Sequence, residues 1–275
     1  MIKINEVKIE RKHFPDNTQL LKPEFVCCGN NINVMWVYEN DEEMITLMYL
    51  MKHFENINKH IVKTLTLYYI PNARMDRVKN KNEVFTLKYF CDFINNLNFN
   101  EVIVFDPHSD VSVALLNNVT VIKPLETLKQ IPFSPDVYYF PDAGAKKRYS
   151  DICGKNDCVC YGEKIREWET GKILGLEIKQ DNLTPIDLKG KTVLLIDDII
   201  SYGGTMYYSI LKLKEMGVTD VSIYCSHLEN SVLNEEKSSL LKLLNDGTIN
   251  TIYTTNSLFT GKHHKIVTLD ISNNT

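Results

Sequence analysis

Short runs of apolar residues alternate along the chain with longer stretches in which apolar residues recur every three or four positions. Residues 32–38 (INVMWVY) have the first pattern, which predicts a strand. Residues 41–57 (DEEMITLMYLMKHFENI) have the second pattern, which predicts a helix with acidic residues in its first turn. A strand at 63–70, a helix at 82–99 and a strand at 101–106 follow. This alternation is typical of α/β folds whose sheets are mostly parallel.

The same order of elements starts again after residues 123–131 (KPLETLKQI). The pattern predicts further strands at 136–141, 158–162, 191–197, 221–227 and 251–256, and helices at 144–153, 205–217 and 234–247. We therefore predict two α/β domains with similar connectivity, 1–125 and 126–275, with the boundary near Pro124.

Several predicted strands end in loops rich in polar residues. These loops read PNARMDR, DPHSD, PDAGAKKR, DDIISYGGT and SH. In open parallel sheets, ligands bind beyond the carboxyl ends of the strands. The sequence therefore places its candidate chemistry at these strand ends.

Residues 193–208 (VLLIDDIISYGGTMYY) carry the strongest of these signals. A strand that ends in Asp197 and Asp198 should place their side chains on opposite faces, with at least one directed into the crevice. The glycine turn that follows should present backbone N–H groups, and the next helix its positive end, to an anion. A sugar phosphate, with hydroxyls at one end and a phosphate at the other, suits both features. The alternative is an ordinary capped turn between a strand and a helix.

Composition narrows the class of protein. The net charge of −4 and the pI of about 6.0 give no basic excess for nucleic acid. No apolar stretch approaches the length of about 18 residues that a membrane span needs. The charged, alternating start MIKINEVKIERKHF is unlike a signal peptide, so we expect a cytoplasmic protein with reduced thiols. Cys153, Cys158 and Cys160 fit no common zinc spacing, and we expect buried strand cysteines in preference to a metal site.

The segment VLLIDDIISYGGT resembles the phosphoribosyl-diphosphate motif of type I phosphoribosyltransferase folds. Four further segments resemble motifs of the ribose-phosphate pyrophosphokinase family, in the same order along nearly the whole chain. They are YIPNARMDR (69–77), VFDPHSD (104–110), PDAGAKKR (141–148) and TTNS (254–257). The resemblance implies two tandem phosphoribosyltransferase-like domains.

The resemblance also implies a reaction. The family uses Mg²⁺, transfers the β,γ-pyrophosphate of ATP to the 1-hydroxyl of ribose 5-phosphate and releases AMP. Such a transfer depends mostly on positioning and on charge neutralisation. By position in the motifs, the ATP-binding candidates are Phe14, Asp16, Arg74, Met75, Arg77 and His108. The metal candidates are His108 and Asp142. His108 without its motif would more often be a structural histidine, and Arg77 would pair with Asp76 or Glu83.

Residues 161–178 resemble the flexible catalytic loop of the family. Lys164 and Arg166 match its two cations, which would stabilise the charge on the transferring group. The alternative is a solvated hairpin with ordinary surface charges. For the ribose phosphate, the resemblance implies Asp197, Asp198, Ser201, Tyr202, Gly203, Gly204 and Thr205.

The sequence departs from the family pattern near both substrates. Ser201 stands where the family's phosphate loop carries an acid, and Tyr202 replaces a small threonine. Thr18 replaces a glutamate near the adenine contacts, and Met75 replaces a glutamine. The chain is also shorter than usual, which leaves allosteric control by phosphate or ADP open. The altered loop also suits a larger acceptor such as ADP-ribose, in a reaction that rebuilds NAD.

Two other classes stay open at this stage: a true phosphoribosyltransferase and a non-catalytic regulatory homologue. The family assembles as dimers that build hexamers, so the resemblance implies a homo-oligomer in which Phe14 and Asp16 contact the ATP of a neighbouring subunit. The expected partners are therefore ATP, a 5-phosphoribosyl acceptor and further copies of the chain, without nucleic acid or membrane.

Overall fold

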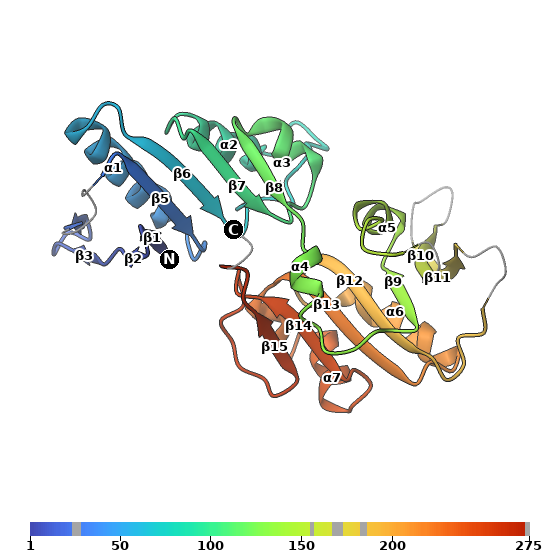
Figure 1. Cartoon of the computed structure of the whole chain (residues 1–275). Coiled ribbons are helices and arrows are strands. Elements are labelled where there is room, and N and C mark those ends of the chain that lie inside the picture. The colour runs from blue at the N-terminus through green and yellow to red at the C-terminus, as the bar shows by residue number, and fades with distance from the viewer. Residues whose placement is uncertain (24–28, 155–156, 167–172, 182–185, 273–275) are drawn as a thin grey trace. The chain divides into compact units, whose positions relative to one another are not determined.

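The computed structural model describes residues 1–23, 29–154, 157–166, 173–181 and 186–272 (Figure 1). The chain forms two compact units. The N-terminal unit comprises Met1–Pro124 together with Ser272, and the C-terminal unit comprises Leu125–Ile271. Each unit has its own sheet and helices, and the prediction of an α/β fold with mostly parallel sheets is confirmed.

The N-terminal unit contains a six-stranded sheet in the order β2-β1-β5-β6-β7-β8. The four strands β5 to β8 are parallel, and β1 pairs antiparallel with both β5 and β2. The strands are β1 (Ile2–Ile4), β2 (Val7–Lys8), β5 (Asn31–Trp36), β6 (Val62–Leu67), β7 (Glu101–Phe105) and β8 (Val119–Ile122). The helices are α1 (Glu42–Ile57), α2 (Thr86–Asn95) and α3 (Asp110–Leu115). A separate hairpin joins β3 (Arg11–His13) to β4 (Gln19–Leu21).

The C-terminal unit contains a seven-stranded sheet in the order β11-β10-β9-β12-β13-β14-β15. All neighbours pair in parallel except β10 and β11, which form an antiparallel hairpin. The strands are β9 (Val137–Phe140), β10 (Cys158–Arg166), β11 (Ile173–Gln180), β12 (Thr192–Ile200), β13 (Asp220–Leu228), β14 (Thr251–Thr255) and β15 (Ile266–Leu269). The helices are α4 (Leu125–Leu128), α5 (Ala143–Arg148), α6 (Gly204–Glu215), the 3-10 turn η1 (Asn230–Leu233) and α7 (Ser239–Asn245).

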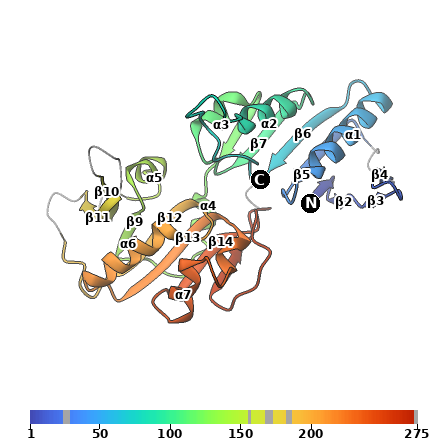
Figure 2. The same cartoon turned by 180° about the vertical axis from the view of Figure 1, so that it is seen from behind.

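Strand β12 is the centre of the C-terminal unit because its two faces belong to two different apolar clusters. Val193 and Leu195 pack with residues of α6 and α7 on the face seen in Figure 2. Leu194 and Ile196 pack on the other face, against residues of β9 and α5. A parallel strand buried on both faces carries a continuous apolar run rather than an alternating one. This requirement explains the sequence VLLI before the acidic pair.

Several predicted elements have different bounds in the structure, among them α2, which is predicted at 82–99 and spans Thr86–Asn95. The helix predicted at 144–153 ends at Arg148, and the strand predicted to end at Asp197 continues to Ile200. The helix predicted at 234–247 begins only at Ser239. The side chain of Asn234 accepts hydrogen bonds from the backbone N–H groups of Glu236 and Lys237, which favours a turn there.

The central position of β12 leads to a stability prediction. Leu195 is fully buried, and its truncation to alanine leaves a cavity that the sheet cannot close. We expect Leu195→Ala to lower the free energy of unfolding by about 2–5 kcal/mol in urea denaturation. Val267 lies exposed on β15, so Val267→Ala should change it by less than about 1 kcal/mol. Equal effects would contradict the assignment of β12 to the core.

Candidate functional site

The acidic pair lies inside β12, where the apolar run ends. Asp198 is buried, and its Oδ2 atom lies 2.7 Å from Nη1 of Arg148, which ends α5. Asp197 is half-buried, and its Oδ1 atom accepts a hydrogen bond of 3.0 Å from the backbone N–H of Asp198. The side chain of Asp198 contributes to the shift in the pKa of Asp197, so the two carboxyl groups act on one another although they are successive residues of one strand. The pair is therefore one site with two carboxyl groups.

Burial and the charge of Asp198 raise the pKa of Asp197 well above its ordinary value. The charge of Asp142 makes the last-named contribution to the same shift. Asp142 follows β9 and precedes α5 as its N-cap, where its Oδ1 atom accepts a hydrogen bond of 2.9 Å from the backbone N–H of Ala145. The carboxyl groups that act on the pKa of Asp197 thus follow or lie in two neighbouring strands, β9 and β12. Arg148, a residue that the sequence interpretation did not single out, provides the opposing charge.

The glycine turn after β12 has the backbone of an anion site. Gly203 has a φ of +77°, a left-handed conformation that favours glycine, and it precedes the first turn of α6. A Cβ atom on Gly203 would lie 2.2 Å from Cγ of Leu240, so the turn packs directly on α7. Gly204 and Thr205 are exposed. Because the first N–H groups of a helix have no acceptor within the helix, this turn directs donors toward solvent.

The neighbouring residues hold the glycine turn in place. The carbonyl of Tyr202 accepts a hydrogen bond of 3.2 Å from the backbone N–H of Ser239, and the carbonyl of Gly203 accepts one of 2.9 Å from that of Tyr207. Tyr202 is 39% exposed. Ser201, which precedes it, is half-buried.

In the N-terminal unit, the loops after β6 and β7 also meet. Nε of Arg77 donates a hydrogen bond of 2.9 Å to Oδ1 of Asp76, so the surface ion pair that we considered for Arg77 is present. This guanidinium lowers the pKa of Asp76, and His108 contributes to the shift from the β7 loop. Arg74 is exposed and Met75 half-buried. The charges of Arg77 and His108 thus both act on Asp76, and the sequence analysis had considered Asp76 only as a partner of Arg77.

Asp106 is a second residue of the β7 loop that the sequence interpretation passed over. It is buried, and its φ of +40° lies in the left-handed region that residues other than glycine rarely adopt. Its backbone N–H donates to the carbonyl of Ile122 at the end of β8. This strained turn directs the chain from β7 into Pro107 and His108.

Phe14 and Asp16 lie in the turn between β3 and β4. The ring of Phe14 is 48% exposed. Oδ1 of Asp16 accepts hydrogen bonds from the backbone N–H of Thr18 (3.0 Å) and from its Oγ1 (2.7 Å). Thr18, which replaces the glutamate of the family pattern, therefore closes the turn. The hairpin presents an exposed aromatic ring beside a carboxylate.

Lys164 and Arg166 lie at the end of β10, where the backbone pairs with β11. The prediction of one polar loop over 161–178 is corrected in part, because both ends of this segment belong to the antiparallel hairpin. The hairpin was the alternative that the sequence left open. The side chains of Lys164 and Arg166, and residues 167–172, lie outside the described part of the chain.

Cys158 and Cys160 are buried neighbours on β10, as expected, whereas Cys153 is half-buried. Burial raises the pKa of Cys160 to about 12, which keeps it a neutral thiol. Among the described residues, no three His, Cys, Asp or Glu side chains are arranged to hold a metal ion. The oxygen donors of Asp142, Asp197 and Asp198 nevertheless suit Mg²⁺ chemically, because a cation there would relieve the repulsion that raises the pKa of Asp197.

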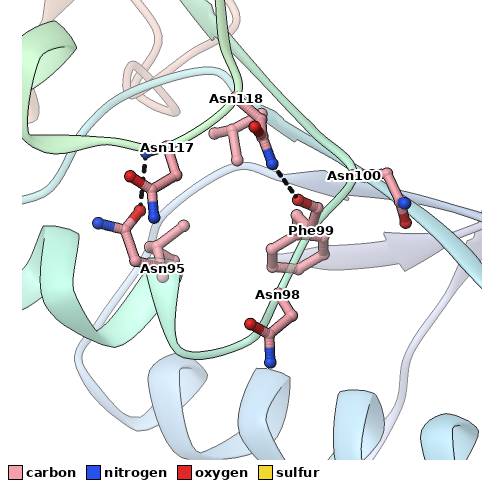
Figure 3. A pocket seen from close by; sticks show the side chains of 8 residues that line it. Asn95, Asn98, Phe99, Asn100, Asn117 and Asn118 are labelled. Carbon is pink, nitrogen blue, oxygen red and sulfur yellow. Dashed lines mark hydrogen bonds between the residues drawn. The ribbon is translucent and has the colours of Figure 1, made fainter.

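A pocket of about 300 Å³ lies elsewhere in the N-terminal unit, at the amino ends of β7 and β8 (Figure 3). Five asparagines line this pocket, and Figure 3 marks two hydrogen bonds between lining residues. Oδ1 of Asn95 accepts from the backbone N–H of Asn117, and Nδ2 of Asn118 donates to the carbonyl of Phe99. The pocket is at the edge of the sheet opposite the loops that carry His108 and Arg74, so it is not part of the candidate site.

The C-terminal unit is similar to a known family of domains, and the whole chain shares its fold with a solved structure. The family model described as phosphoribosyl transferase domain matches residues 162–252, which include the acidic pair and the glycine turn. The solved structure of phosphoribosylpyrophosphate synthetase from Mycobacterium smegmatis aligns with a TM-score of 0.72 at 17% identity, covering 97% of this chain and 87% of that one. At this identity the match shows the shared fold.

Two similar proteins from different organisms share one name. The chain is 26% identical over 282 residues to ribose-phosphate pyrophosphokinase of Sulfurisphaera tokodaii, covering 99% of this chain and 91% of the relative. It is also 26% identical over 232 residues to the protein of that name from Methanobrevibacter smithii, covering 80% and 77%. The chain is thus similar to proteins named ribose-phosphate pyrophosphokinase over most of its length. Within the described residues, no helix is long and apolar enough to cross a membrane.

The two glycines of the turn make a matched pair of variants. Gly203→Ala should lower the free energy of unfolding by at least about 2 kcal/mol, because the new methyl group meets Leu240 and the backbone is left-handed. A Cβ atom on Gly204 meets nothing within 4 Å, so Gly204→Ala should keep or slightly raise stability. Thermal unfolding of the two variants checks this, and a stable Gly203→Ala protein would contradict the geometry of the turn.

The acidic pair should make the protein's stability fall as pH rises. A carboxyl group with a raised pKa binds more protons in the folded than in the unfolded state, and stability falls between the two pKa values. In metal-free protein, Asp197→Asn should therefore raise the urea midpoint at neutral pH and flatten its dependence on pH.

Asp136 is a control for Asp197, because its pKa is lowered whereas that of Asp197 is raised. Its carboxylate accepts hydrogen bonds from the backbone N–H and the Oγ1 of Thr192, and these bonds lower its pKa. Asp136→Asn should therefore lower the urea midpoint at neutral pH. A loss of stability in Asp197→Asn would count against repulsion within the pair.

Proposed function

We propose that the protein transfers the β,γ-pyrophosphate of ATP to the 1-hydroxyl of ribose 5-phosphate and releases AMP. The observation that carries this proposal is the acidic pair followed by the left-handed glycine turn at the carboxyl edge of a parallel sheet. It occurs in a chain that is similar along nearly its whole length to enzymes named ribose-phosphate pyrophosphokinase. In the reaction, the 1-hydroxyl oxygen bonds to the β-phosphorus. The bond from that phosphorus to the α,β-bridging oxygen breaks, and the hydroxyl proton is lost.

The acceptor's two ends match the two features of the C-terminal unit. Asp197 and Asp198 would accept hydrogen bonds from the sugar hydroxyls, and Arg148 holds Asp198 in position. The N–H groups at Gly204 and Thr205 would donate to the 5-phosphate at the positive end of α6. Ser201, Tyr202 and Gly203 form the rest of this phosphate loop.

For ATP, we propose contacts of Arg74 and Arg77, in the N-terminal unit, with the phosphates, with Met75 next to them in the chain. As ligands of Mg²⁺ we propose His108 in the N-terminal unit and Asp142 in the C-terminal unit, each considered by itself. Mg²⁺ lowers the charge repulsion between the phosphates when it is bound. The exposed ring of Phe14 offers a surface on which adenine can stack, and Asp16 can accept from its amino group.

The proposal extends to the assembly and the location of the protein. An exposed Phe14 at the tip of a hairpin suits a contact with the ATP of a neighbouring subunit in a homo-oligomer, either a dimer or a hexamer. The neutral, buried thiols of Cys158 and Cys160 suit the reducing cytoplasm.

A larger acceptor, such as ADP-ribose, is the second candidate substrate. Two observations favour it. The space beside Gly204 is open, and the exposed ring of Tyr202 flanks the phosphate loop where a 5-substituent would leave it. The transfer chemistry would be the same, because the acceptor is the free 1-hydroxyl of a ribose in both cases. In ADP-ribose this is the ribose that is not attached to adenine.

A mass-spectrometric screen of acceptors with ATP and Mg²⁺ tests the proposal. Ribose 5-phosphate should yield AMP and a product that is heavier by one pyrophosphoryl group. ADP-ribose is screened in parallel, and a product from it alone would replace the first substrate with the second. Absence of AMP with every ribosyl acceptor would refute pyrophosphoryl transfer.

Lys164 and Arg166 should stabilise the transferring group. We expect Lys164→Ala and Arg166→Ala each to lower kcat by about 100- to 1000-fold, because each removes a cation that acts on developing charge. Lys179, which pairs with Glu177 on β11, is the matched control, and Lys179→Ala should leave kcat within about twofold. Steady-state AMP formation measures all three, with circular dichroism to verify folding. A loss under tenfold in both test variants would show that these are not the catalytic cations.

A further inference from the structure

A chain of hydrogen bonds runs from the phosphate loop to a carboxylate on another part of the fold. Oγ of Ser201 lies 3.0 Å from Oγ of Ser231, and Oγ of Ser231 donates a hydrogen bond of 3.2 Å to Oε2 of Glu229. Ser231 and Ser201 are separated by 30 residues in the sequence. We call these three residues the Glu229 relay.

Counting protons fixes the direction of the relay. A hydroxyl group has one proton, and that of Ser231 is donated to the carboxylate. The bond between the two serines must then be donated by Ser201. Its own proton is thereby used, so the lone pairs of Ser201 Oγ remain as hydrogen-bond acceptors.

The backbone around the relay is held on both sides. The backbone N–H of Glu229 donates to the carbonyl of Ile200, which joins the ends of β13 and β12. Beside Ser231, Val232 is fully buried, and the side chain of Asn230 accepts from the N–H groups of Thr260 and Gly261. Glu229 and Ser231 therefore cannot move far from Ser201 while the sheet is intact.

We propose that Glu229 is a positioning residue for acceptor binding, which acts through Ser231 to hold Ser201 as a hydrogen-bond acceptor for a sugar hydroxyl. A phosphate oxygen of the ionised ligand has no proton to donate, whereas a pentose hydroxyl has one. In the family pattern the phosphate loop carries an acid at the position of Ser201. Here Glu229, which directly follows β13, would supply a carboxylate to this position through Ser231. This inference rests on the proposed function, since it takes a phosphorylated pentose as the ligand of the loop.

Relocating the charge tests the relay in the full-length protein. Glu229→Gln removes the carboxylate and should raise KM for the acceptor about three- to tenfold, the size of one hydrogen bond, with kcat changed less than about twofold. In the single variant Ser201→Asp, the new carboxylate and that of Glu229 compete for the one hydroxyl proton of Ser231. One carboxylate is then left without this hydrogen bond, and KM should also rise. The double variant Ser201→Asp with Glu229→Gln should return KM to within about threefold of the wild-type value.

Glu235→Gln is the matched control, because it removes the same charge from an exposed position in the same unit. It should leave KM unchanged. A merely structural role for Glu229 would give lower thermal stability and no rescue in the double variant, and that result would overturn the proposal. An unchanged KM in Glu229→Gln would overturn it too, while leaving pyrophosphoryl transfer intact.

Calorimetric binding of ribose 5-phosphate, and of ADP-ribose in parallel, separates the relay from the reaction. If the wild type forms no AMP but binds an acceptor, weaker binding by Glu229→Gln and recovery in the double variant support the relay and refute the proposed reaction. If the wild type binds neither compound, both the relay and the proposed function fail.

Discussion

The repulsion between Asp197 and Asp198 is the interaction on which the candidate site depends. Water would separate and solvate two carboxyl groups, but β12 holds them together at the end of a buried apolar run. Such an arrangement opposes folding unless protons, a cation or ligand hydroxyls compensate for it. The positive charge of Arg148 compensates for the negative charge of Asp198. The raised pKa of Asp197 shows that its own charge is not compensated to the same extent. A polyhydroxylated, phosphorylated substrate with a divalent cation would complete the site.

The sheet and the glycine turn convert this acidic pair into a site with two ends. Burial of both faces of β12 fixes the position of the strand, and the packing of Gly203 on Leu240 fixes where α6 begins. The backbone N–H donors at the start of α6 and the carboxylate acceptors of β12 are therefore only a few residues apart in the chain, and both are fixed in place. The same principle appears in the N-terminal unit, where the charges of Arg77 on one loop and His108 on the next both act on Asp76.

Much of this arrangement could be predicted from the sequence, because the signals were local. The apolar run of β12, the acidic pair and the glycines are adjacent, and their pattern predicts strand, turn and helix. The hairpin of β3 and β4 was missed, since RKH and QLL are too short and too polar to show alternation. The hydrogen bond from the backbone N–H of Asp198 to the Asp197 side chain was also missed, because a pattern of apolar and polar residues does not indicate such a contact. Arg148 and Glu229 come from distant segments that only the folded sheet brings near the pair and Ser201.

A crystal structure of the protein with ribose 5-phosphate tests most directly whether the acidic pair and the glycine turn form one sugar-phosphate site. The account predicts the 5-phosphate within hydrogen-bond distance of the backbone nitrogens of Gly204 and Thr205, with the ring hydroxyls at Asp197 and Asp198. A phosphate bound elsewhere, with the glycine turn in contact only with solvent, would contradict it.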